Sequence, residues 1–553
     1  MKNQAVQVLF TSIVIGFLLI SCDQKGEINK QNIQSAEKII GLQYTETERD
    51  SLVEDLNVVL EDYEKNRKVS VENSVAPKFT FDPRPINYSN NTKQLDLKWN
   101  IPNDIALPEN IKELAFYSIP ELASLIRHKK ITSTKLTKFY IDRLKQYGDT
   151  LECVVTMTEE LALKQAQQAD NQISEGIYKG PLHGIPYGVK DLFAVEGYKT
   201  TWGAAPYKDQ NLEYTAEVLK RLEAAGGVLV AKLTLGALAM GDVWYDGVTK
   251  NPWDLQQGSS GSSAGSASAT AAGLVPFAIG TETWGSIVSP STRCGVTGLR
   301  PTFGRVSRDG AMALSWTMDK IGPICRSAYE CALIFDAIRG QDPKDQSTVN
   351  YPFNYTTEIN VSNLKVGYLK DLFYGEDYRG QKNDSISIEV LKSLGIELKE
   401  VKLPDNIEVY SLAIILEAEA GAAFDELTRS NSDDELVAQH KYAWPNIFRK
   451  SRFIPAVEYL QASRIRSMLI EEFHELIQEY DIIVCPSFGG SQLLMTNLTG
   501  HPCVVVPNGF DEKNHPTSIS FIGNLYDEAT ILAFAKKYQD ITEFNKVHPD
   551  FFK

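Results

Sequence analysis

Residues 258–302 read GSSGSSAGSASATAAGLVPFAIGTETWGSIVSPSTRCGVTGLRPT, and this stretch carries the strongest signal in the chain. It begins like a flexible linker, because glycine, serine and alanine dominate its start. It then becomes apolar, with a hydrophobic run at 271–279 followed by Trp284, Ile287 and Val288. A linker would remain polar, so the pattern indicates a buried segment of a folded domain.

Two other loops have a similar composition. A phosphate-binding loop is disfavoured, because neither G-x-x-x-x-G-K-[ST] nor a G-x-G-x-x-G behind a strand is present. Residues 261–265 match the nucleophile elbow G-x-S-x-G, with Ser263 in the nucleophile position. That elbow should follow a buried strand, whereas residues 251–257, NPWDLQQ, contain Pro252 and predict a loop.

Several motifs in one order resemble the amidase signature family. SGSSAGS at 260–266 is similar to the family's serine-rich loop, G-G-S-S-G-G-S. GTETWGSIVSP at 280–290 is similar to G-T-D-x-G-G-S-I-R-x-P, and CGVTGLRPT at 294–302 is similar to C-G-x-x-G-[LF]-[KR]-P-T. Upstream, GIPYGVKD at 184–191 is similar to G-[IV]-P-x-x-[VI]-K-D. With weaker matches elsewhere, the resemblance covers about residues 111–545.

The resemblance implies a Ser–Ser–Lys triad for amide hydrolysis, with Ser286 as nucleophile, Ser262 as bridging serine and Lys190 as base. These roles make chemical sense, because an amide is a poor electrophile and a serine hydroxyl needs a base to attack it. Lysine serves as a base only when neutral, and burial among apolar neighbours lowers its pKa. The resemblance also implies a cis peptide bond before Ser262, and a reaction that needs no metal or cofactor.

The resemblance further implies an oxyanion hole formed by backbone N–H groups of Thr283, Trp284, Gly285 and Ser286. Trp284 departs from the family, which usually has glycine there, so this residue must keep a negative φ or be strained. Its indole is a candidate for shaping the acyl pocket.

Other departures concern specificity. Val288 replaces the family's usual arginine, which removes a candidate contact to an anionic substrate. Ala264 replaces a glycine, and Ala237 stands where the related subunits of tRNA amidotransferases tend to carry an acid.

The rest of the main body predicts alternating helices and strands. Helix starts are expected at Ser118, with Glu121 three residues on, and at Ser133. Continuous apolar runs predict buried strands at 184–190, 227–232, 482–484 and 503–506. This order predicts the α/β class, and the resemblance implies one domain, residues 108–553, with a large mixed β-sheet sandwiched between helices.

The N-terminus predicts export. Lys2 is followed by an apolar run at 8–20 and by Leu19-Ile20-Ser21-Cys22, which resembles a bacterial lipobox. The run is too short to span a membrane. We therefore expect residues 1–22 to be a lipoprotein signal peptide and the protein to be an exported, membrane-anchored lipoprotein that touches the membrane only through a lipidated Cys22. An ordinary signal peptide with a chance cysteine is the alternative.

Residues 23–107 predict a tether and a helical extension. A helical pattern runs over 36–68, with start-of-helix residues at 45–48, and the proline-containing stretch 71–99 predicts extended chain along the main body. The six remaining cysteines are expected to be buried thiols rather than disulfides, since a protein of this size needs no staples: Cys153, Cys294, Cys325, Cys331, Cys485 and Cys503.

Together these features predict an exported amidase acting on a small or medium amide. The net charge of −15 argues against a nucleic-acid surface, and the scattered histidines give little support to a metal site. The main alternative is the glutaminase component, or A subunit, of an aminoacyl-tRNA amidotransferase, which releases ammonia from glutamine. A catalytically inactive amidase-like binding lipoprotein is another. The substrate and the oligomeric state are not encoded in any readable motif.

Overall fold

The structure is a computed structural model that describes residues 28–375 and 378–553. The chain divides into two compact units, Met1–Glu72 and Asn73–Lys553. The expected signal peptide, residues 1–22 with Cys22, lies outside the described residues. Within the described ranges, none of the helices has both the length and the apolar character needed to cross a membrane.

The first unit contains two helices, α1 (Lys30–Ile40) and α2 (Glu46–Asn66). Thr45 caps α2 in a capping box with Glu48, as the start-of-helix residues predicted. The predicted helical stretch is interrupted at Gly41, which ends α1 with a φ of 69° that glycine adopts without strain. Between the helices, Arg49 Nε donates to Glu37 Oε1 at 2.6 Å.

Residues 73–107 form an extended segment that belongs to the second unit and packs against the rest of it. The segment contains no helix or strand, as predicted for 71–99. Phe81 meets Phe303 edge to face, with ring centroids 5.0 Å apart, and the Arg466 guanidinium lies 3.5 Å from the Phe81 centroid. Farther along, the hydroxyl of Tyr88 donates to Leu525 O at 3.1 Å.

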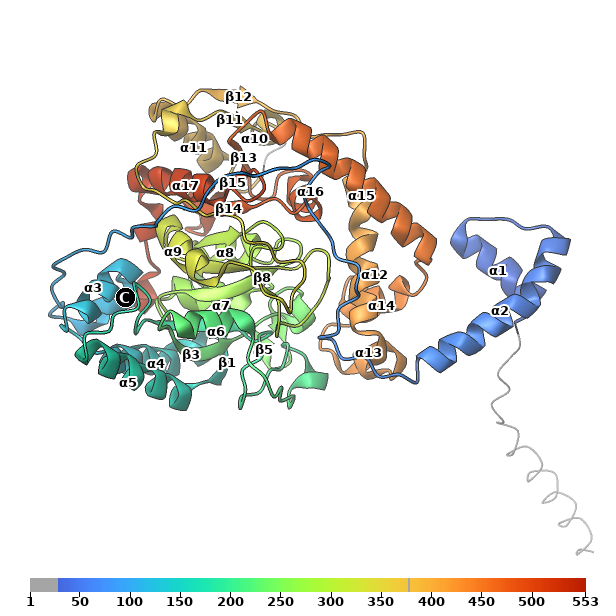
Figure 1. Cartoon of the computed structure of the whole chain (residues 1–553), viewed down its shortest axis with the longest axis horizontal. Coiled ribbons are helices and arrows are strands. Elements are labelled where there is room, and N and C mark those ends of the chain that lie inside the picture. The colour runs from blue at the N-terminus through green and yellow to red at the C-terminus, as the bar shows by residue number, and fades with distance from the viewer. Residues whose placement is uncertain (1–27, 376–377) are drawn as a thin grey trace, which may run out of the picture. The chain divides into compact units, whose positions relative to one another are not determined.

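The second unit is built on one mixed sheet of 11 strands, which confirms the predicted α/β class (Figure 1). Its parallel pairs are β2 with β3, β2 with β8, β11 with β12 and β11 with β13, and the other neighbours are antiparallel. The order across the sheet is β1 (Val154–Met157), β3 (Val228–Leu233), β2 (Pro186–Lys190), β8 (Ala278–Glu282), β10 (Lys320–Cys325), β9 (Thr297–Arg300), β14 (Cys503–Phe510), β15 (Pro516–Gly523), β13 (Ile482–Pro486), β11 (Val366–Tyr368) and β12 (Leu398–Glu400).

Both faces of the sheet are buried, which is why its central strands are apolar without alternation. On β14, Val504 and Val506 pack into the core beneath α9 (Ala328–Ile338), α11 (Gln381–Ser393) and α17 (Glu528–Thr542). Val505 faces the other way, into the cluster that contains Val288 of α8 (Val288–Cys294). Helix α7 (Ala264–Ala271) covers β8 and β10 beside α8.

The remaining helices surround this sandwich. Helices α12 (Ile414–Ala423), α13 (Asp425–Arg429), α14 (Trp444–Ser451) and α15 (Ala456–Ile477) gather beside the sheet (Figure 1). The others are α3 (Ile119–Arg127), α4 (Ser133–Leu151), α5 (Glu159–Ser174), α6 (Glu217–Ala224), α10 (Lys370–Phe373) and α16 (Gln492–Leu498). Ser118 caps α3 with Glu121 as predicted, and α4 begins at Ser133 with Thr132 as its cap.

One local prediction is wrong. Residues 251–257 were expected to form a loop, but β7 (Asp254–Gly258) pairs with β6 (Lys250–Asn251) in a two-stranded ribbon. A second ribbon joins β4 (Val243–Trp244) to β5 (Gly247–Val248). Pro252 lies in the connection between β6 and β7, where no ladder hydrogen bond is needed. The half-exposed β7 lacks the apolar run that marks a buried strand.

Candidate active site

Lys190 ends β2 in the interior of the sheet, and its side chain is fully buried. Its Nζ donates to Ser262 Oγ and to Thr281 Oγ1, each at 2.8 Å. Burial lowers the pKa of Lys190 to about 7, because desolvation disfavours the ammonium form. The negative charges of Asp319 and Glu282 act in the opposite direction. Near neutral pH, a large share of Lys190 is therefore neutral and able to accept a proton.

Ser262 lies at the start of the turn that leads into α7. The peptide bond between Gly261 and Ser262 is cis, as the family resemblance implied. The chain passes so close to a neighbouring loop that a Cβ atom at position 261 would lie 1.8 Å from Gly241 O, and only glycine fits there. Ser262 is only 1% exposed, so its hydroxyl faces Lys190 rather than solvent.

Ser286 lies in the turn between β8 and α8 and is partly exposed, unlike Ser262 and Lys190. Its carbonyl oxygen accepts from Ser263 N at 3.2 Å, which joins the two serine loops. Lys190 and Ser262 are thus in direct contact, and Ser286 is brought next to them through the backbone. In the described structure, no hydrogen bond links the Ser262 and Ser286 hydroxyls to each other.

Glu282 holds the turn that carries Ser286. Its Oε2 accepts from Ile287 N at 2.8 Å and from Val288 N at 3.0 Å, while Oε1 accepts from Arg300 Nη1 at 2.9 Å. Burial by itself raises the pKa of Glu282, but Arg300 and these backbone donors lower it to about 2. Glu282 therefore stays ionised. Because it precedes the loop 283–286 and accepts from the two residues that follow it, Glu282 joins the two ends of this loop.

The predicted oxyanion-hole residues form this loop. The left-handed position falls on Gly285, with φ 87°, and Trp284 keeps the negative φ that a side chain requires. Among the described residues, the backbone N–H groups of Trp284, Gly285 and Ser286 have no hydrogen-bond acceptor. Unpaired N–H groups next to a serine are the donors that an oxyanion needs. The indole of Trp284 is 38% exposed, and its ring centroid lies 6.3 Å from that of Tyr410.

The geometry disfavours Ser263 as a nucleophile. Its hydroxyl is fully buried, donates to Thr281 O and accepts from Thr281 N, both at 3.1 Å. The strand before it, β7, belongs to the half-exposed ribbon rather than to the central sheet. Ser263 therefore fastens the serine loop to β8, which is a structural task.

Two polar residues of this site, Thr281 and Asp319, were not predicted from the sequence. Thr281 shares Lys190 with Ser262, and its place directly before Glu282 in the GTE motif is a signal that points to it. Asp319 accepts a hydrogen bond from Thr283 Oγ1 at 2.5 Å. No sequence motif identified Asp319. The contact arises because β8 and β10 pair in an antiparallel register that sets Glu282 opposite Lys320.

Comparisons with known proteins identify the family of this chain. The family described as Amidase matches residues 135–493. The chain is 32% identical over 484 residues to the A subunit of glutamyl-tRNA(Gln) amidotransferase from Carboxydothermus hydrogenoformans, covering 79% of this chain and 99% of that protein. The corresponding protein of a Marinomonas species is 34% identical over 480 residues, with coverages of 78% and 98%.

Solved structures show the same architecture. Native peptide amidase from Stenotrophomonas maltophilia superposes with a TM-score of 0.71 at 26% identity, covering 78% of this chain and 98% of that one. The A subunit of glutamyl-tRNA(Gln) amidotransferase from Thermotoga maritima gives a TM-score of 0.66 at 26% identity, with coverages of 79% and 97%. Since the family match spans more than half of the chain and includes the lysine and both serine loops, this protein belongs to the amidase family.

Proposed function

We propose that this protein is an amidase that hydrolyses a linear amide through an acyl-enzyme on Ser286. The observation that carries the proposal is the contact between the buried Lys190, whose pKa is lowered to about 7, and Ser262, next to a loop with unpaired N–H groups. A neutral lysine is a base of suitable strength for a reaction near neutral pH.

In the proposed mechanism, Ser286 Oγ attacks the amide carbonyl. Its proton passes to Ser262, while the Ser262 proton passes to neutral Lys190. The carbonyl oxygen becomes an oxyanion that the N–H groups of Thr283, Trp284, Gly285 and Ser286 are placed to stabilise, each donor that engages it contributing about 2.7–4 kcal/mol to lowering the barrier. The C–N bond then breaks, and the proton held by Lys190 returns through Ser262 to the leaving amine.

Water completes the cycle. A water molecule takes the place of the amine, gives its proton through Ser262 to Lys190, and attacks the ester of Ser286. Breaking the ester releases the carboxylic acid, and the Lys190 proton returns to Ser286 Oγ. An ester substrate would follow the same route, since esters are the easier electrophiles, so esterase activity is expected alongside amidase activity.

The glutaminase component, or A subunit, of an aminoacyl-tRNA amidotransferase is the second candidate, because relatives from Carboxydothermus and Marinomonas are named as the A subunit of glutamyl-tRNA(Gln) amidotransferase. One departure from those relatives and the charge of the chain favour a stand-alone hydrolase. Ala237 stands where such relatives tend to carry an acid, and the net charge of −15 does not favour a surface for tRNA.

The two candidates differ in what they hydrolyse. We expect the wild type to release ammonia or amine from a panel of simple amides and amino-acid amides without tRNA, and Ser286→Ala to release none. Hydrolysis restricted to glutamine and increased by tRNA would favour the second candidate. Failure of the folded wild type on every amide and ester would instead favour an inactive, ligand-binding relative.

We further propose that the protein is exported and anchored through a lipid on Cys22. Lys2, the apolar run at 8–20 and the Ser21-Cys22 pair support this proposal. Metabolic labelling with a fatty-acid probe tests it: the wild type should incorporate the lipid and fractionate with membranes, and Cys22→Ala should do neither. Unlabelled protein in the wild-type cells would contradict the anchor.

A further inference from the structure

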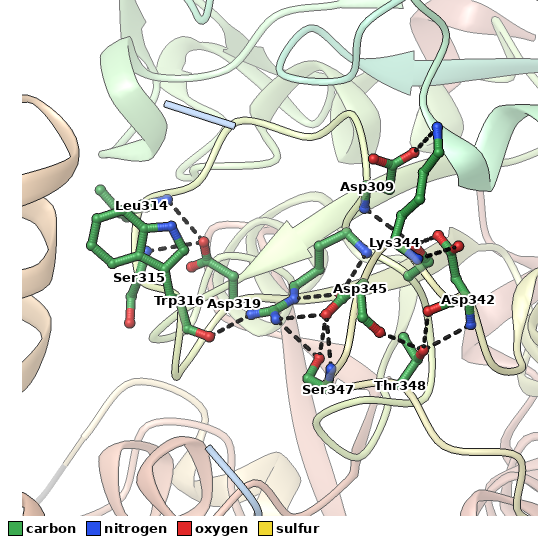
Figure 2. A network of polar contacts seen from close by, with 12 residues as sticks. Asp309, Leu314, Ser315, Trp316, Asp319, Asp342, Lys344, Asp345, Ser347 and Thr348 are labelled. Atoms are coloured by element: carbon green, nitrogen blue, oxygen red, sulfur yellow. Dashed lines mark hydrogen bonds and ion pairs between the residues drawn. The ribbon is translucent and has the colours of Figure 1, made fainter. Parts of the chain in front are cut away.

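Asp319 connects the proposed oxyanion loop to a second loop beside the site. Its Oδ1 accepts from Thr283 Oγ1 at 2.5 Å, and its Oδ2 accepts from Leu314 N at 2.8 Å and Ser315 N at 3.0 Å. All three partners are donors, which is the arrangement that an ionised carboxylate requires. Figure 2 shows the Asp319 side chain turned toward the backbone of Leu314 and Ser315.

The loop 314–316, which donates to Asp319, also forms hydrogen bonds with other parts of the chain. Arg308 Nη1 donates to Trp316 O at 2.6 Å, and the same guanidinium forms an ion pair with Asp345, Nε to Oδ2, at 2.9 Å. Ser315 Oγ donates to Glu419 Oε2 at 2.5 Å. These hydrogen bonds restrain the Asp319 carboxylate, and through it they restrain the Thr283 hydroxyl that donates to it.

The carboxylate also acts on the base. Asp319 and Glu282 are the two acidic groups whose charges favour the ammonium form of Lys190. The charge of Glu282 is matched by Arg300 in direct contact. Asp319 has no such ion pair among the described residues, but the positive charges of Arg308 and Lys320 also interact with it. Burial raises the pKa of Asp319, and its hydrogen bonds to Thr283, Ser315 and Leu314 offset part of that effect.

We propose that Asp319 is a positioning residue for amide hydrolysis: it fixes the oxyanion loop through the Thr283 hydroxyl and places a negative charge near Lys190. The inference rests on the proposed function. It assigns two separable tasks to one side chain. Fixing the loop keeps the N–H groups of 284–286 aimed at the developing charge. The charge keeps Lys190 basic enough to take a proton despite its burial.

The test measures how fast a fluorophosphonate probe labels Ser286 across a pH range on both sides of neutrality. The labelling rate should rise as Lys190 loses its proton. Asp319→Asn removes a negative charge that favours the ammonium form, so the pKa of Lys190 should fall and the rise should move to lower pH by about one unit. Asp342→Asn is the matched control, since Asp342 belongs to the neighbouring contacts in Figure 2 but does not touch Thr283.

A second variant separates the positioning of the oxyanion loop from the effect of the Asp319 charge on Lys190. Thr283→Val removes the hydroxyl and leaves Asp319 ionised, so the limiting labelling rate should fall on the order of tenfold without a shift along the pH axis. Thr283→Ser keeps the hydroxyl and should restore the rate. Thermal unfolding of each variant checks that it is folded. If Asp319→Asn does not fold, the comparison of Thr283→Val with Thr283→Ser decides the proposal.

The outcomes distinguish the inference from the function on which it rests. A wild type that the probe does not label would overturn both. A labelled wild type whose pH profile is the same in Asp319→Asn and Asp342→Asn would overturn the inference alone. So would a Thr283→Val protein that reacts at the wild-type rate.

Discussion

At the scale of single residues, the burial of Lys190 lowers the stability of the fold. A lysine whose side chain is fully buried loses its hydration, and the structure responds by lowering its pKa from 10.5 to about 7. In the unfolded chain the same lysine remains protonated up to about pH 10. Folding at neutral pH therefore requires Lys190 to release a proton, which reduces stability but leaves a usable base.

Replacing Lys190 should therefore have opposite effects on activity and on stability. Lys190→Met should abolish probe labelling of Ser286 and raise the free energy of unfolding at neutral pH by about 1–3 kcal/mol. The sign follows from proton binding, since between pH 7 and 10.5 the unfolded state binds the proton that the folded state releases. The stability gain should be full below the folded pKa and fade as the pH rises toward 10.5. Denaturant unfolding at several pH values checks this, and a destabilised Lys190→Met would contradict it.

Trp284 predicts a preference for apolar acyl groups. Its indole is partly exposed beside the ring of Tyr410, and Val288 leaves no cation at the position where the family usually has arginine. Trp284→Ala should lower kcat/KM for amides with a large apolar acyl group about tenfold relative to acetamide. Tyr442→Ala, at an exposed aromatic residue that shares no ring contact with Trp284, is the control. Equal losses for large and small amides would rule out a role in specificity.

At the scale of elements, Glu282 joins the end of β8 to the start of α8. Its folded pKa of about 2 lies below the ordinary value of 4.5, so its stabilising effect is complete above pH 4.5 and is lost as the pH falls through about 2. Glu282→Gln should destabilise the fold by about 3–5 kcal/mol at neutral pH, because it leaves Arg300 without its buried partner.

The pH dependence makes this prediction specific. The stability difference between wild type and Glu282→Gln should shrink by about 1–2 kcal/mol between neutral pH and about pH 3.5. Denaturant unfolding at both pH values measures it. A difference that stays constant would show that Glu282 acts through its shape rather than its charge.

The sequence predicted elements where one physical signal was strong. Buried apolar runs identified β2, β3, β13 and β14, and the Ser118–Glu121 capping box identified the start of α3. The β6–β7 ribbon was missed because a half-exposed two-stranded ribbon leaves no apolar run. The break between α1 and α2 at Gly41 was not predicted, because the predicted helical pattern runs over 36–68, although the start-of-helix residues at 45–48 mark where α2 begins.

The candidate site was predictable only in part, for a similar reason. Lys190, Ser262 and Ser286 lie in motifs, and the structure places all three in one region. Asp319 belongs to no motif that was recognised, and it reaches Thr283 through the register of β8 and β10. Strand register depends on the packing of both sheet faces and is not written in any short segment.

At the scale of the whole molecule, the extended segment 73–107 belongs to the amidase body. Phe81 lies between Phe303 and Arg466, and Asn73 Nδ2 donates to Ala313 O at 2.9 Å. A chain that begins at Asn73 keeps these contacts and is the reference for removing the segment. A chain that begins at residue 108 should be less stable, because it exposes the apolar surface that this segment covers.

Thermal unfolding of the two shortened chains checks this division. Phe81→Ala offers a smaller change and should destabilise the body by about 2–3 kcal/mol, less than the range of about 3–5 kcal/mol for a fully buried aromatic side chain, because Phe81 is only partly buried. Equal stability of the chains that begin at 73 and at 108 would show that the segment only rests on the surface.

The central claim is that Ser286 forms an acyl-enzyme with help from Lys190, and peptide mapping after reaction with a fluorophosphonate probe tests it most directly. The account predicts one adduct, on the peptide that contains Ser286, which persists in Ser263→Ala and is absent from Ser286→Ala and Lys190→Met. An adduct on Ser263, or no adduct on folded wild-type protein, would contradict it.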